Sequence, residues 1–172
     1  MNNHKTCKRG FKFAILLLFL VLLSGHAYAA WETVGRVTKI VSSKANGVVL
    51  ETSSRAKVSV EFSGNNVVRV RVAPTGKFER EFSYAFDPAG GFREPKVVVS
   101  QTPTSITMTN GDGTRVVIQK ATFGIAIFDE KGSSIVQNDA ADPTAFNLAT
   151  GEVKTTMMRR SEVETYYGFG EK

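Results

Sequence analysis

Carboxylates are the main candidates for catalytic side chains from residue 30 onward. The 172-residue chain has one cysteine, Cys7, and two histidines, His4 and His26, and all three precede residue 30. The remaining sequence therefore excludes thiol nucleophiles, disulfides, Ser-His-Asp triads and histidine-ligated metals. We expect neither a metal nor a cofactor in residues 30–172.

These carboxylates do not stand out as a catalytic pair. Hydrolysis of a glycosidic bond uses two carboxylates roughly 5–10 Å apart. The acids here fall in turns or on alternating faces of expected strands, where solvated surface charge is the ordinary role. They are Glu51, Glu61, Glu79, Glu81, Asp112, Asp129 and Glu130. We expect no catalytic residue among them.

Three further groups have weaker functional interpretations. Gly168-Phe169-Gly170 lacks the third glycine and the following helix of a phosphate-binding loop. Lys154, Arg159 and Arg160 are expected to form a charged strand face. Several aromatic residues could stack on a sugar ring, but core packing is expected for most of them, and Trp31 is expected to be exposed. They are Trp31, Tyr84, Phe92, Tyr166 and Tyr167. No sugar-binding residue can be assigned.

Residues 1–29 have the pattern of a secretory signal peptide. A basic start up to Lys12 precedes the apolar run 13–23, and Ala27-Tyr28-Ala29 fits a cleavage site. The run is short for a spanning helix, which needs about 20 residues. We expect cleavage before Ala30 and export to the periplasm or the exterior, with no membrane association afterwards; a retained anchor is the alternative.

The charge balance argues against nucleic acid as a partner. The whole chain carries a formal charge of +6. Residues 1–29 hold four of the 22 basic side chains and none of the 16 acidic ones, so the remainder carries only +2. Nucleic-acid binding needs a clustered basic surface, which this balance does not provide.

Alternating apolar residues predict β-strands from Val34 onward. Two hairpins are expected: 37–41 with 48–52 around Asn46-Gly47, and 57–62 with 67–72 around residues 63–66. In the second hairpin one face is predicted to be buried. That face consists of Val58, Val60, Phe62, Val68, Val70 and Val72.

The same pattern continues towards the C-terminus. Further extended segments are expected at 78–86, 96–101, 105–109, 114–120, 123–128, 134–137, 152–160 and from 166 onward. Residues 138–151 are predicted to be a long loop. Apolar runs such as Val97-Val98-Val99 and Val116-Val117-Ile118 indicate sheets that are covered on both sides. Ten to twelve strands without an amphipathic helix predict an all-β fold, an antiparallel β-sandwich or barrel.

The end of the chain resembles a known motif. Residues 164–171 read Glu-Thr-Tyr-Tyr-Gly-Phe-Gly-Glu, which is similar to the motif closing the N-terminal domain of glycoside hydrolase family 31, the α-glucosidases and α-xylosidases. Residues 68–74, 82–85 and 123–129 resemble strands of that domain in the same order. The resemblance covers about residues 34–172, and Tyr167, Gly168, Phe169, Gly170 and Glu171 are its most specific part.

The resemblance implies a galactose-mutarotase-like β-sandwich that precedes a catalytic barrel. The family's nucleophile is an aspartate in a Trp-x-Asp-Met segment. Trp31, the only tryptophan, is followed by Glu32-Thr33 and does not match. The general acid also belongs to the barrel. Aldose epimerases use histidines, which residues 30–172 lack, so that activity is not expected.

The leading hypothesis is that residues 30–172 form the N-terminal, non-catalytic, carbohydrate-binding-type β-sandwich of an exported α-glycosidase, truncated before its barrel. The chain alone is expected to be inactive. Residues 167–171 would be a structural junction to the missing barrel, and an oligosaccharide would be the substrate of the parent enzyme. The alternative is a stand-alone secreted sugar-binding or adhesive β-sandwich.

Overall fold

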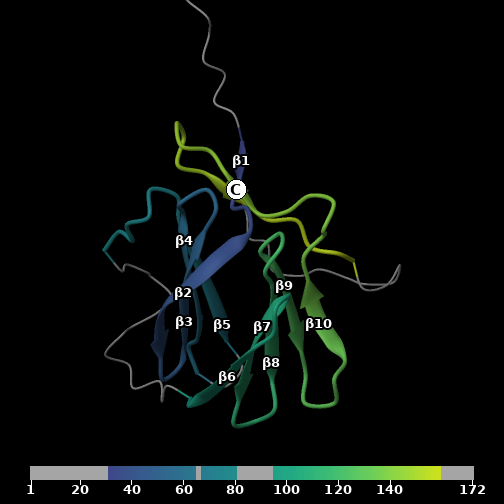
Figure 1. Ribbon diagram of the computed structural model, residues 1–172. Coiled ribbons are helices and arrows are strands. Elements are labelled where there is room, and N and C mark those ends of the chain that lie inside the picture. The colour runs from purple at the N-terminus through teal and green to yellow at the C-terminus, as the bar shows by residue number, and fades with distance from the viewer. Residues whose placement is uncertain (1–30, 65–66, 81–94, 160–172) are drawn as a thin grey trace, which may run out of the picture. The chain divides into compact units, whose positions relative to one another are not determined.

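The computed structural model describes residues 31–64, 67–80 and 95–159. Every regular element in these ranges is a β-strand, and all strand pairs are antiparallel. No helix in these ranges is long and apolar enough to cross a membrane. The all-β class expected from the alternating pattern is confirmed. Figure 1 shows the arrangement of the strands.

A four-stranded sheet contains both predicted hairpins. Its strands follow chain order: β2 (Val37–Lys44), β3 (Gly47–Thr52), β4 (Lys57–Phe62) and β5 (Val68–Ala73). The turn between β2 and β3 is fixed by Asn46, whose side chain donates to the carbonyl of Phe62 at 3.1 Å. Gly47 lies so close to β4 that a Cβ would overlap the carbonyl oxygen of Val60. The predicted Asn46-Gly47 hairpin therefore also depends on contact with a third strand.

The second sheet is a five-stranded meander. It contains β6 (Val97–Gln101), β7 (Ser105–Asn110), β8 (Arg115–Gln119), β9 (Gly124–Phe128) and β10 (Ser134–Gln137). Asn110 fixes the predicted turn after β7, because its Oδ1 accepts from the N–H groups of Asp112 and Thr114 at 3.1 and 2.9 Å. Asp129 acts similarly after β9, accepting from Lys131 and Ser133. Side-chain capping of this kind explains why these residues favour turns.

A small third sheet joins the beginning and the end of the described chain. Its strands are β1 (Glu32–Thr33), β11 (Ala145–Phe146) and β12 (Val153–Lys154), with β11 in the centre. The prediction of a loop throughout 138–151 is wrong at β11. Ala145 and Phe146 are both buried, so their burial rather than their local pattern determines the strand. Of the extended segment predicted at 152–160, the structure describes β12 and a bridge from Met157 to Asn138.

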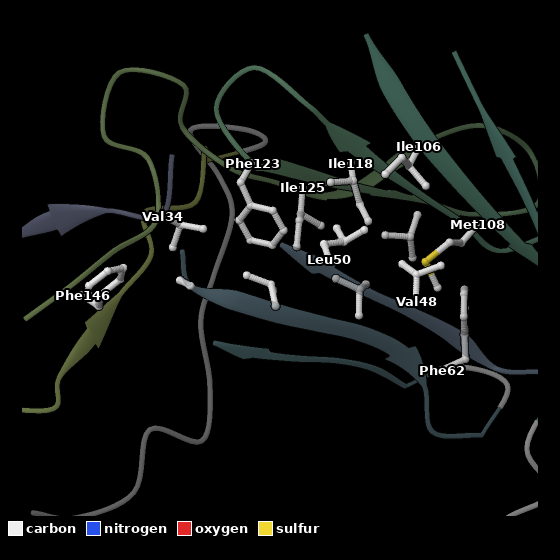
Figure 2. Close-up of a cluster of buried hydrophobic side chains, with 14 residues drawn as sticks. Val34, Val48, Leu50, Phe62, Ile106, Met108, Ile118, Phe123, Ile125 and Phe146 are labelled. Atoms are coloured by element: carbon white, nitrogen blue, oxygen red, sulfur yellow. The ribbon is translucent and has the colours of Figure 1, made fainter. Parts of the chain in front are cut away.

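The core lies between the four-stranded and five-stranded sheets. Figure 2 shows apolar side chains of both sheets facing one another, with Leu50 and Val48 opposite Ile118, Ile106 and Met108. The same cluster also contains residues from outside these two sheets, among them Val34, Phe123 and Phe146. Fully burying each large apolar side chain contributes about 1.5–3 kcal/mol to the free energy of unfolding. Face-to-face packing of two antiparallel sheets makes the fold a β-sandwich.

Two predictions about burial are wrong. Val70 was expected to be buried with Val68 and Val72, yet it is 41% exposed because β5 is the edge strand of its sheet. Val98 is 73% exposed on β6, also an edge strand, so the expected burial on both sides fails there. The segment 81–86, the signal sequence 1–29 and the final strand from residue 166 lie outside the described residues.

Candidate functional site

Three of the carboxylates singled out from the sequence form ion pairs or hold a turn. Glu51 of β3 pairs with Lys39 of the neighbouring strand β2 at 3.3 Å, and Glu61 of β4 pairs with Lys44 of β2 at 3.2 Å across the intervening strand β3. Asp129 holds a turn through two backbone N–H groups, and Asp112 lies in another turn. Within the described residues, no group of three His, Cys, Asp or Glu side chains could hold a metal ion. Glu81 lies outside these ranges.

The third sheet carries a charged cluster around Asp142. Asp142 accepts hydrogen bonds from Thr156 Oγ1 at 2.7 Å and from Lys154 Nζ at 3.1 Å. The Thr156 hydroxyl, followed by Lys154, lowers the pKa of the Asp142 carboxyl below its ordinary value of 3.8. The Lys154 ammonium also lies 5.4 Å from the ring centre of Trp31, a cation–π distance. The cluster connects Trp31, which precedes β1, to Lys154 of β12 across the central strand β11.

This cluster changes the interpretation of two predicted groups. Trp31 is exposed, as expected, at 44%. Lys154 was grouped with Arg159 and Arg160, but the structure places it with Trp31 and Asp142. Arg160 lies outside the described residues, as do Tyr84, Phe92 and the motif residues Tyr167, Gly168, Phe169, Gly170 and Glu171.

The outer face of the five-stranded sheet has a hollow of about 450 Å³. Its floor is low because β9 presents Gly124 and Ala126 outward while Ile125 points into the core. Val117 of β8, the register partner of Ala126, extends this apolar floor. Phe128 forms one end, where the Arg115 guanidinium lies 4.9 Å from its ring centre.

Polar groups surround the floor of this outer-face hollow. Each of the four strands β7 to β10 contributes one residue to a row across the floor: Thr107, Val117, Ala126 and Gln137. Two residues further along, Gln119 of β8 is the register partner of Gly124 of β9. Within the described residues, no hydrogen-bond partner is found for the side chains of Thr107, Gln119 or Gln137. In the sequence, the small residues Gly124 and Ala126 are the one sign of this hollow. They indicate a hollow only once it is known that both lie on the outer face of the sheet.

Asn138 fixes the other end of the outer-face hollow. It is 6% exposed, and its Oδ1 accepts from the N–H of Ile125 at 2.8 Å. Its Nδ2 donates to Thr155 Oγ1 at 2.6 Å and to the carbonyl of Thr156 at 3.2 Å. One side chain therefore ties β9, the end of β10 and the segment after β12 together. The adjoining residues Asp139, Ala140 and Pro143 complete the wall. Sequence reasoning assigned this segment only to a loop.

A second hollow, of about 380 Å³, lies between β5 and the β11–β12 hairpin. The Arg71 guanidinium lies 5.3 Å from the ring centre of Phe78 and donates to the carbonyl of Glu79 at 3.0 Å. Across the hollow, Leu148 is 60% exposed and Val153 is 46% exposed. This hairpin hollow combines exposed apolar side chains with an ordered arginine, a composition common at protein interfaces.

Comparisons with known proteins agree with this sandwich. Residues 57–172 match the family model of the glycosyl hydrolase 31 N-terminal galactose mutarotase-like domain. No curated protein matches the sequence.

Solved structures with the same fold include a dextranase of this family from Flavobacterium johnsoniae, determined with isomaltotriose. It is 22% identical with a TM-score of 0.65, over 76% of this chain and 16% of the dextranase chain. The cycloalternan-forming enzyme from Listeria monocytogenes, determined with a pentasaccharide substrate, is 18% identical with a TM-score of 0.55. That match covers 68% of this chain and 10% of the enzyme chain.

The family match extends over more than half of the sequence, and the strand arrangement agrees with the corresponding part of both enzymes. This chain spans only a small fraction of their length. The chain therefore belongs to glycoside hydrolase family 31, and it carries that family's N-terminal galactose mutarotase-like domain.

Proposed function

We propose that this chain is the non-catalytic N-terminal β-sandwich of an exported α-glycosidase. The match of residues 57–172 to the family's N-terminal domain carries the proposal. In the whole enzyme a separate catalytic domain would hydrolyse terminal α-glycosidic bonds with two carboxylates. The sandwich would support that domain by packing against it.

The hairpin hollow supports this packing role. Leu148 and Val153 expose apolar side chains beside Arg71, which is already held in position by Phe78 and Glu79. Ordering an arginine in advance lowers the entropy cost of a later contact. We propose that the catalytic domain covers this surface, which we call the hairpin surface: Arg71, Phe78, Leu148 and Val153.

Sequencing the gene beyond codon 172 tests the proposed parent enzyme. The proposal expects an open frame that encodes a Trp-x-Asp-Met segment within a barrel. A frame that continues into an unrelated domain would contradict it.

Export is tested by N-terminal sequencing of the protein recovered from outside the cytoplasm, with Ala30 expected as the first residue. An intact Met1 terminus on the recovered protein would contradict cleavage.

A second function is favoured by the outer-face hollow. Its apolar floor and surrounding amide and hydroxyl groups are the composition of a small-molecule site. A sugar-binding β-sandwich that acts without a catalytic domain would use such a site. It differs from the first proposal in expecting a stable monomer whose hairpin surface needs no partner.

A further inference from the structure

We propose that the outer-face hollow binds one or two units of a neutral oligosaccharide. This inference rests on the proposed role of the domain in a carbohydrate-active enzyme, and it gives that role a specific site. The site consists of Val117, Ala126 and Phe128 with the polar residues Thr107, Gln119 and Gln137.

The shape of the outer-face hollow suits a ring-shaped ligand. Gly124 and Ala126 leave a shallow floor, whereas Phe128 and the Asn138–Pro143 wall rise at its two ends. Asn138 bonds to Ile125 of β9, three residue steps from Phe128, which is roughly 10 Å at the rise of an antiparallel strand. The volume of about 450 Å³ lies within the range of small-molecule sites.

The chemistry of the lining favours a sugar. A pyranose has an apolar C–H face, which the floor of Val117 and Ala126 can cover. It also has hydroxyls that both donate and accept hydrogen bonds, as the Gln119 and Gln137 amides and the Thr107 hydroxyl do. These amide and hydroxyl groups have no hydrogen-bond partner among the described residues and are available to a ligand.

The charges argue against an anionic ligand. Among the described residues that line the outer-face hollow, one is a cation, Arg115, and one is an anion, Asp139, and they lie near opposite ends. Arg115 is positioned over the Phe128 ring, and Asp139 Oδ1 accepts from the N–H of Ala141 at 2.8 Å. A phosphate group is usually held by several cationic or backbone donors. A lining without net charge fits a neutral ligand.

Hydrogen bonds hold the Asn138 end of the site in place. The buried Asn138 side chain bonds to the Ile125 N–H of β9 and to the segment 155–156. The strand pairs β7–β8–β9 run in register beneath the floor without a bulge. A preformed site loses little conformational entropy when a ligand binds.

The test is a titration of the full chain with glucose, isomaltotriose and maltotriose, followed by NMR chemical shifts of backbone amides. We expect the largest shifts at Val117, Ala126 and Gln137. The variant Ala126→Phe fills the floor without removing a core contact, and should weaken binding about tenfold or more. Gln137→Ala should weaken it several-fold. Val98→Phe, on an exposed position of β6, is the control and should leave affinity unchanged.

Absence of shifts at 50 mM sugar would overturn the proposal, as would shifts confined to other strands or unchanged affinity in Ala126→Phe. Circular dichroism of each variant separates loss of the site from loss of the fold. Failure of binding would not contradict the non-catalytic role, because gene sequence and turnover test that role separately.

Discussion

The side chain of Asn138 accepts a hydrogen bond from the backbone N–H of Ile125 at 2.8 Å, and both residues are buried. The same side chain donates to Thr155 and Thr156. This one residue therefore connects the five-stranded sheet to the segment that follows β12. It also forms one end of the outer-face hollow.

Replacing Asn138 should destabilise the domain. Asn138→Ala leaves the buried N–H of Ile125 without its partner, which costs about 1–3 kcal/mol of unfolding free energy. Urea unfolding measures this loss, and hydrogen exchange of the Ile125 amide should accelerate in the same variant. The exposed neighbour gives a matched control, since Gln137→Ala should change stability by less than about 0.5 kcal/mol. Equal stability of the two variants would contradict the assigned role.

Two glycines, Gly47 at the start of β3 and Gly111 in the turn after β7, should respond differently to the same substitution. A Cβ on Gly47 would overlap the Val60 carbonyl, whereas a Cβ on Gly111 would meet nothing within 4 Å. Overpacking of this kind costs roughly 1–3 kcal/mol, so Gly47→Ala should lower the melting temperature by several degrees. Gly111→Ala, the matched control, should leave it nearly unchanged. A reversed order of the two melting temperatures would show that β3 and β4 are not this close.

The contribution of Asp142 should depend on pH. The Thr156 hydroxyl and then Lys154 lower the pKa of Asp142 in the folded protein below 3.8. The unfolded chain then binds the proton more readily, so the contribution to stability is present above about pH 3.8 and is lost as the pH falls below it. At pH 6 the wild type should have a higher melting temperature than Asp142→Asn. The difference between the two melting temperatures should shrink towards pH 3. The fluorescence of Trp31, the only tryptophan, should report the local change.

A difference that stayed constant from pH 6 to pH 3 would exclude Asp142 ionisation as its cause. Asp112→Asn is a suitable control because Asp112 occupies an exposed turn. We expect its effect on the melting temperature to be small at both pH values.

The hairpin surface should bind hydrophobic dyes in the isolated chain. Exposed apolar patches commonly mark interaction sites, and Leu148 and Val153 face the same hollow. The double variant Leu148→Ser, Val153→Thr should lower the fluorescence of bound 8-anilinonaphthalene-1-sulfonate at unchanged stability. Val98→Thr removes a separate valine that is 73% exposed, more than either residue of the hairpin surface, and should have little effect. Equal dye binding in all three proteins would leave the proposed contact with a catalytic domain without support.

The sequence predicts the strands better than it predicts their surroundings. Alternation placed β4 and β7 correctly, and Asn110 and Asp129 marked turns because their side chains cap backbone N–H groups. The predicted burial of Val70 was wrong because alternation of apolar residues identifies one face of a strand but does not show whether another sheet covers that face. The two-residue strand β11 has too little length for any period, so its burial depends on contacts distant in sequence.

The hollows could not be predicted for a related reason. Gly124 and Ala126 form a floor only because Thr107, Val117 and Gln137 lie beside them on three other strands. Register across four strands is a tertiary property. The motif at residues 167–171 was recognised by its residue types, and its role as a junction stays a prediction because it lies outside the described residues.

Turnover by the purified chain tests the central claim, a non-catalytic domain, most directly. The assay measures release of 4-nitrophenol from 4-nitrophenyl α-glucoside and of glucose from isomaltotriose. A mock purification from host cells that lack the gene controls for a contaminating host enzyme. The account predicts that the wild type gives no more signal than this mock preparation. Hydrolysis by the wild type that exceeds the mock preparation and scales with the concentration of the chain would contradict it.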